Sequence, residues 1–246
     1  MIHDKFTFGI CTDGKSPHNI EKVIDSILSN NINPSNFEII IIGGDITPRI
    51  HPNVLFIPFN EEVKPGWITR KKNIIVQEAK FDNVLLVHDY FMIADDWYSG
   101  FLKYEKSFNI LICPIVTPSG ERYIDWTLYV GWENRKDLYT IIPEMKFQER
   151  LLPYNLTIKE WQYLPGNAFM VNKHFYLQYP LDENLVWGQE DIVWTEFVKP
   201  HTHFSCNPHS KLIMLKEKHN LQGHFEPIPN EILDKLKEQG LLCPVE

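Results

Sequence analysis

Apolar and polar positions along the first part of the chain alternate between two spacings. Residues 6–10 and 38–42 are short, continuous apolar runs, which are typical of strands covered on both faces. Between them, residues 17–28 place isoleucine, valine and leucine at i, i+3, i+4, i+7 and i+8, the spacing of one buried helix face. A strand, a helix and a second strand in this order predict a βαβ unit with parallel strands.

The alternation continues to about residue 116. Residues 54–57, 84–87 and 109–116 have the composition of strands, and residues 67–79 and 95–106 that of helices. Strands that alternate with helices of about a dozen residues indicate a three-layer α/β fold. In such a fold the ligand site lies at the carboxyl ends of the strands.

The second half of the chain has a different texture, with short aromatic runs and several prolines. We expect a strand over 166–171, a helix from 187 to 198, strands over 203–206 and 212–215, and a last amphipathic helix from 230 to 239. No internal repeat or low-complexity linker interrupts the sequence. We therefore predict one domain over 1–246, with a nucleotide-sugar-binding half (1–116) and an acceptor-binding half with a C-terminal helix (117–246).

Composition narrows the possible partners. The 246 residues include 24 Lys+Arg and 32 Asp+Glu, a net charge of −8, and the nearest approach to a basic patch is residues 70–72. Because non-specific nucleic-acid affinity comes from basic groups, we expect no nucleic-acid partner. The chain is 13% aromatic, which is high and favours flat ligands or sugars.

Neither a membrane span nor a framework of cysteines, as zinc knuckle or disulfides, is predicted. No run approaches the roughly 18–20 apolar residues that cross a bilayer, and the first residues lack a signal peptide's pattern, so we expect a cytoplasmic protein. Cys11, Cys113, Cys206 and Cys243 are far apart in sequence and form no CxxC pair. We expect buried thiols rather than a zinc knuckle or disulfides.

Polar residues that could carry chemistry follow the predicted strands or begin a predicted helix. Thr12-Asp13, Gly44-Asp45 and His88-Asp89 each come after a strand, so they belong at one edge of the sheet. Glu190-Asp191 lies at a helix start, where adjacent side chains point about 100° apart and would serve different roles. One carboxylate near an acceptor hydroxyl could take its proton.

These motifs, in this order, resemble GT-A glycosyltransferases of the family 2 type. The C-terminal part is similar to β-1,4-galactosyltransferases, in which a Trp-Gly-x-Glu-Asp motif precedes a histidine and Glu-Pro-x-Pro. The matching residues are Thr12-Asp13, Gly43-Gly44-Asp45, Gly66, Lys71-Lys72-Asn73-Ile74, His88-Asp89-Tyr90, Asp96-Trp97, Trp187-Gly188-Gln189-Glu190-Asp191 and His219 to Pro229.

The resemblance implies a GT-A, Rossmann-like α/β fold: a mixed, mostly parallel sheet between helices, with a C-terminal extension on the acceptor side. It implies that Asp191 is the catalytic base and that Glu190 orients the sugar. Acceptor contacts would come from Trp187 and Gly188. Donor-binding residues would be Thr12, Asp13 and Asp45 for the nucleoside, and Arg70, Lys72, Asn73 and His88 near the diphosphate.

The expected metal site departs from the family pattern. His88-Asp89-Tyr90 stands where the family has Asp-x-Asp, so a single carboxylate, Asp89, remains to bind Mn²⁺ or Mg²⁺ together with the donor diphosphate. The galactosyltransferase pattern implies His219 as a second ligand, and His209 is its rival. Whether the metal is required stays open.

The predicted function is that of an inverting glycosyltransferase. It would move a sugar from a nucleotide-diphosphate donor, UDP-linked by preference, to a hydroxyl of a glycan acceptor, as in polysaccharide biosynthesis. A nucleotidyltransferase is the first alternative, although the Gly-rich phosphate loop it needs is not evident. The other alternative is a non-catalytic relative that binds nucleotide sugars or glycans. Tyr90, which stands where the family has a second carboxylate, favours this alternative.

Overall fold

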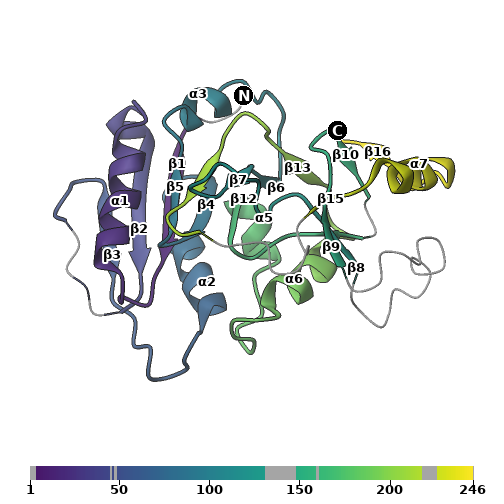
Figure 1. Ribbon diagram of the computed structural model, residues 1–246. Coiled ribbons are helices and arrows are strands. Elements are labelled where there is room, and N and C mark those ends of the chain that lie inside the picture. The colour runs from purple at the N-terminus through teal and green to yellow at the C-terminus, as the bar shows by residue number, and fades with distance from the viewer. Residues whose placement is uncertain are drawn as a thin grey trace.

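The computed structural model describes residues 4–44, 46, 49–130, 148–158, 161–217 and 226–245. A seven-stranded sheet runs through the molecule in the order β13-β6-β12-β4-β1-β2-β3 (Figure 1). Its strands are β1 (Phe6–Cys11), β2 (Phe37–Ile42), β3 (Val54–Ile57), β4 (Asn83–His88), β6 (Ile110–Ile112), β12 (Ala168–Asn172) and β13 (Phe204–Cys206).

The strand directions confirm a mixed, mostly parallel sheet. β1 pairs in parallel with β2 and β4, β2 with β3, and β13 with β6. Only β12 is antiparallel to its neighbours β4 and β6 in this sheet. Because β12 lies between two strands of the first half, the two predicted halves share one sheet, and their boundary stays a prediction.

Helices cover both faces of the sheet. On one face, α1 (Pro17–Leu28) and α3 (Trp97–Phe101) pack with Phe6, Phe8 and Ile10 of β1. On the other lie α2 (Ile68–Glu78), α5 (Lys173–Gln178) and α6 (Glu190–Val198), and α7 (Asn230–Glu238) joins the same core through Ile232 and Leu236. In β2, Ile39 and Ile41 face the first layer and Ile40 and Ile42 the second. The continuous isoleucine run is therefore explained by burial on both faces.

Two expected elements differ in the structure. The strand predicted over 109–116 is split into β6 and β7 (Ile115–Val116), which belong to different sheets. Pro114 lies between them and has no N–H for a sheet ladder. The helix predicted over 95–106 covers only 97–101, because the chain then turns tightly and buries Tyr104 in the core.

Short strands form three small sheets, of whose strands the apolar pattern predicted only β14 (Leu212–Met214) and, within 109–116, β7. A 3₁₀ turn, η1 (Pro34–Asn36), precedes β2.

In the described part of the chain, no helix is long and apolar enough to cross a membrane. Cys11, Cys113 and Cys206 are buried free thiols, as expected, whereas Cys243 is exposed. The remaining strands are β5 (Phe91–Ile93), β8 (Thr127–Val130), β9 (Gln148–Leu151), β10 (Leu156–Thr157), β11 (Gln162–Tyr163), β15 (Glu226–Pro227) and β16 (Cys243–Pro244).

Candidate active site

Three segments meet at one edge of the central sheet. Cys11 pairs with His88, so Thr12 and Asp89 leave β1 and β4 side by side. Ala168 pairs with Val87 in the antiparallel direction, which brings the segment before β12, with Gly166, to the same edge. The Thr12 hydroxyl donates to Asp89 Oδ2 at 2.7 Å. The register of the sheet therefore joins residues that are more than 70 positions apart in sequence.

The loop after β1 is a tight, internally bonded turn. The Gly14 N–H donates to Thr12 Oγ1 at 2.9 Å, and the Lys15 N–H donates to Asp13 Oδ1 at 3.0 Å. Partial burial acts to raise the pKa of Asp13, but the N–H and ammonium of Lys15 outweigh it and lower this pKa. A Cβ on Gly43 would lie 1.8 Å from the Thr12 carbonyl oxygen. Glycine at position 43 thus lets the loop after β2 close on Thr12.

Asp89 is a partly buried carboxyl group with few cations nearby. Burial raises the pKa of Asp89; the hydroxyl of Thr12 opposes this shift, as do the charges of Lys216 and Lys71. The Lys216 ammonium lies 3.7 Å from the centre of the Tyr90 ring. An ionised Asp89 is therefore costly in this fold and would gain from a cation or a further hydrogen-bond donor.

Two consecutive lysines of α2 connect the loops at this edge. Lys71 Nζ donates to the Thr12 carbonyl at 2.7 Å and forms an ion pair with Glu61. Lys72 Nζ donates to the Gly166 carbonyl at 2.6 Å. Lys71 is 4% exposed and Lys72 1%, so these lysines are not a solvated helix face. Buried cations are tolerated when they are hydrogen-bonded, as both are here.

Asp191 lies in the first turn of α6 and faces Gly166. Its Oδ2 accepts hydrogen bonds from the Gly166 N–H, at 2.8 Å, and from the Tyr163 hydroxyl. Its neighbour Glu190 is 4% exposed and accepts from the Gly188 N–H at 2.8 Å. The two carboxylates therefore have different hydrogen-bond partners. Gly166 thus binds Asp191 through its N–H and Lys72 through its carbonyl.

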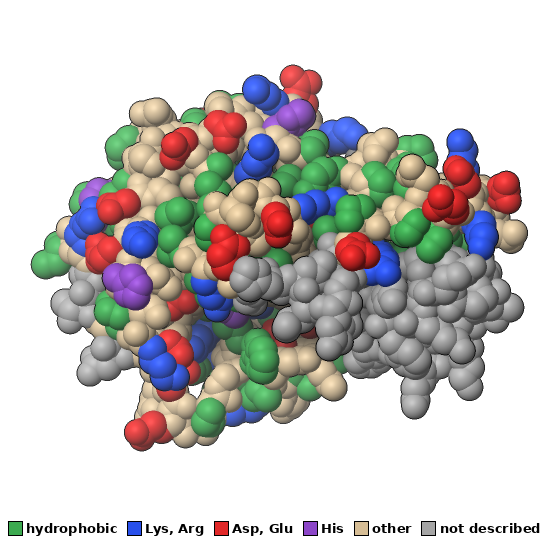
Figure 2. All heavy atoms as spheres, in the orientation of Figure 1, with side chains coloured by type: hydrophobic (Ala, Val, Ile, Leu, Met, Phe, Trp, Pro, Cys, Tyr) green, Lys and Arg blue, Asp and Glu red, His purple; other side chains and the backbone are tan. Residues whose placement is uncertain are grey.

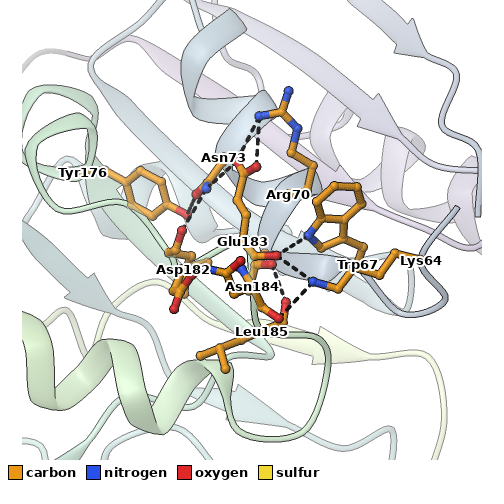
Figure 3. Close-up of polar contacts among 11 residues, drawn as sticks. Lys64, Trp67, Arg70, Asn73, Tyr176, Asp182, Glu183, Asn184 and Leu185 are labelled. Carbon is orange, nitrogen blue, oxygen red and sulfur yellow. Dashed lines mark hydrogen bonds and ion pairs between the residues drawn. The ribbon is translucent and has the colours of Figure 1, made fainter.

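A second set of contacts fixes the loop before α6 to the start of α2, with Glu183 at its centre (Figure 3). The Glu183 carboxylate accepts from Arg70 at 2.9 and 3.2 Å and from Asn73 at 2.9 Å. Its backbone carbonyl accepts from Lys64 Nζ and from Trp67 Nε1, each at 2.7 Å. We call these five residues the Glu183 clamp.

The clamp extends along the backbone to Trp187. The Thr69 hydroxyl donates to the Leu185 carbonyl at 2.8 Å, and the Trp187 N–H donates to the Gly66 carbonyl at 3.0 Å. The Trp187 side chain is 74% exposed. The structure therefore holds an aromatic ring in solvent on a backbone that is fixed to α2. No sequence motif pointed to Glu183, which follows Asp182 in a polar loop.

The other predicted site residues have different surroundings. Arg70 and Asn73 contact Glu183, Lys72 contacts Gly166, and His88 ends β4, so the donor-binding role of these residues stays a prediction. Asp45 and His219 lie outside the described residues.

His209, the rival metal ligand, is not beside Asp89. Its carbonyl packs against Gly100 of α3. In β14, Leu212 pairs with Ile93, and the N–H of Leu215 donates to the carbonyl of Tyr90. It is therefore the end of β14 that comes to Asp89, and His209 precedes the opposite end. The register of β14 against β5 therefore places His209 away from Asp89, and its role as a metal ligand stays a prediction.

The described residues supply little of a metal centre. Among them, no group of three or more His, Cys, Asp or Glu side chains is placed to hold an ion. Asp89 offers one carboxylate, whereas a hard divalent cation takes about six oxygen-rich ligands. Further ligands would have to come from a bound diphosphate, water or residues beyond the described ranges.

Charges on the visible face of the molecule are mixed. In Figure 2, acidic and basic side chains of the described residues are interspersed and do not gather into a broad basic surface. This distribution agrees with the net charge of −8.

Comparison with known proteins identifies the fold. No family model matches the sequence, and no curated protein matches it. Among solved structures, GalNAc-T7 with UDP, GalNAc and Mn²⁺ is similar, with a TM-score of 0.60 and 12% identity over 95% of this chain and 47% of that chain. S. aureus TarS 1-349 with UDP-GlcNAc gives a TM-score of 0.57 and 14% identity over 87% of this chain and 60% of that one.

These likenesses confirm the predicted GT-A fold of glycosyltransferases. With UDP alone, TarS 1-349 aligns at a TM-score of 0.54 and 13% identity, over 85% of this chain and 60% of that one. The chain thus spans about half to three-fifths of the length of these neighbours.

Proposed function

We propose that this protein is an inverting glycosyltransferase that moves a sugar from a UDP-linked donor to a hydroxyl group of a glycan acceptor. The observation that carries the proposal is the placement of Asp191. Its carboxylate is held by Gly166 and Tyr163 at the sheet edge where Thr12 and Asp89 also lie. A candidate base and a candidate nucleoside-diphosphate site therefore share one edge.

The transfer reaction requires one group near the glycan hydroxyl that can take its proton. The acceptor oxygen attacks the anomeric carbon, its proton passes to the Asp191 carboxylate, and the bond from that carbon to the diphosphate breaks, with the electron pair leaving on UDP. The hydrogen bonds from Gly166 and Tyr163 orient Asp191. A positioned general base of this kind contributes roughly 10²–10⁴-fold to rate.

The donor is proposed to lie across the loops after β1, β2 and β4. Thr12 and Asp13, together with Asp45, would contact the nucleoside, since nucleotides bind in crevices at the carboxyl ends of parallel strands. GalNAc-T7 and TarS, which share this fold, were each solved with UDP or a UDP-sugar. On the acceptor side, the exposed Trp187 ring offers a flat apolar surface for a sugar.

A divalent cation, Mn²⁺ by preference, is proposed to bind with the donor diphosphate. Asp89 fits as one ligand, because its buried carboxylate gains from a neighbouring positive charge. His219 is proposed as the second ligand from the chain. When bound, the ion would neutralise charge on the departing diphosphate.

The test is to incubate purified protein with a panel of nucleotide sugars and a mixture of glycan acceptors, and to measure release of nucleoside diphosphate. The proposal expects release from a UDP-sugar that rises when an acceptor is present. Binding of UDP without any release from the whole panel would favour the alternative, a non-catalytic relative that binds nucleotide sugars or glycans. Release of pyrophosphate would indicate a nucleotidyltransferase.

A further inference from the structure

A cavity lies at the opposite end of the central strands from the candidate active site. It has a volume of about 630 Å³, and its wall includes Asn109, just before β6, and His203, just before β13. β6 and β13 run in the same direction as β1 and β4, so these are amino ends, whereas Thr12 and Asp89 follow carboxyl ends. The cavity is therefore separate from the site described above.

Two lysines and a histidine line this cavity. They are Lys106, Lys199 and His203, and no described residue of the lining is Asp or Glu. Lys199 is paired with Glu196 at 2.8 Å, whereas Lys106 and His203 form no ion pair with the described residues. In a chain with a net charge of −8, a basic lining favours an anionic ligand.

One buried amide in the lining lacks a hydrogen-bond partner. Gln162 is 1% exposed, and its Oε1 accepts from the Thr157 hydroxyl, while its Nε2 has no acceptor among the described residues. A buried donor without an acceptor costs about 1–3 kcal/mol. Gln162 lines the cavity, so a ligand oxygen that reached its Nε2 would supply the missing acceptor.

The volume of the cavity and its apolar lining residues indicate the size and character of the rest of the ligand. A volume of about 630 Å³ falls within the usual range for small-molecule sites and exceeds the needs of a bare phosphate ion. Phe108 and Phe204 also line the cavity and offer apolar ring surface. We propose that this cavity binds a sugar-sized ligand that carries a phosphate or carboxylate group, with Lys106 and His203 facing the anion and Gln162 donating to it.

The experiment uses the ¹⁵N-labelled full chain and follows the Gln162 side-chain amide by NMR, assigned by its loss in Gln162→Leu. The chain is titrated with glucose 6-phosphate, glucuronate and glucose. We expect a saturable shift of the Gln162 signal with at least one of the two anions and none with glucose at the same concentrations. Comparing the two anions identifies which acidic group the cavity prefers.

Charge variants test the assignment without disturbing the core. Lys106→Glu should weaken anion binding about tenfold or more, the effect of losing one charge-assisted contact. Lys103→Glu, on the same exposed loop but outside the lining, should leave it unchanged. No saturable shift with either anion, equal binding of glucose, or equal weakening by both charge variants would overturn the proposal. None of these outcomes depends on transferase activity.

Discussion

Removing the Glu183 side chain should loosen the loop that carries Trp187. The substitution Glu183→Ala deletes three hydrogen bonds: two from Arg70 and one from Asn73. The Arg70 pair is about one-third exposed on both sides, so it is worth at most about 1 kcal/mol. Asn73 is 3% exposed, and its bond to Glu183 is worth about 1 kcal/mol. Together the loss is about 1–2 kcal/mol.

The effect on activity follows from what the clamp holds. The backbone contacts of Lys64 and Trp67 remain in Glu183→Ala, so the loop should move rather than unfold. We expect kcat/KM for the acceptor to fall by about 5–30-fold, the equivalent of 1–2 kcal/mol. Glu183→Gln keeps an acceptor for Asn73 and should recover most of the loss.

Urea unfolding and steady-state transfer kinetics measure the two effects, with Glu62→Ala as the control that removes one exposed acidic charge nearby. A double-mutant cycle with Arg70→Met isolates the ion pair, for which we expect about 0.5–1 kcal/mol. If Glu183→Ala matches Glu62→Ala in both unfolding midpoint and acceptor kinetics, the clamp does not position this loop.

Two further predictions concern the donor side. Asp89→Asn should be as stable as the wild type at pH 7 or more stable, because the native state holds the Asp89 proton more tightly than the unfolded chain, so ionisation costs stability above this raised pKa. The difference in stability between variant and wild type should shrink as the pH falls through that pKa. The variant should also lose UDP-dependent transfer. A melting temperature below that of the wild type at pH 7 would contradict the argument. UDP and Mn²⁺ should each raise the other's affinity in calorimetry, as linkage requires, and Asp89→Ala or His219→Ala should abolish the coupling. Full activity in excess chelator would contradict the proposed role of the metal ion.

Much of the fold could be predicted from the sequence because several of its elements have strong local hydrophobic patterns. The isoleucine run of β2 and the helical spacing over 17–28 report burial directly, and the structure confirms both elements. The pattern did not predict several of the shortest strands, such as β5, β10 and β16. Elements this short have no periodicity, and their pairing is fixed by tertiary contacts.

The candidate site was predictable only in part. Order along the chain placed Thr12 and Asp89 at strand ends, and the structure brings them into contact. The burial of Lys71 and Lys72 could not be foreseen, because a lysine pair at a helix start ordinarily faces solvent. Their partners are backbone carbonyls of distant loops, and backbone groups carry no sequence signal.

The central claim, that Asp191 is the base for sugar transfer, is tested most directly by Asp191→Asn. The amide keeps the size of the side chain and can still accept from Gly166 and Tyr163, but it cannot take a proton. We predict that transfer falls by roughly 10²-fold or more, while UDP binding by calorimetry stays within about twofold of the wild type. Near-normal turnover in this variant would contradict the assignment.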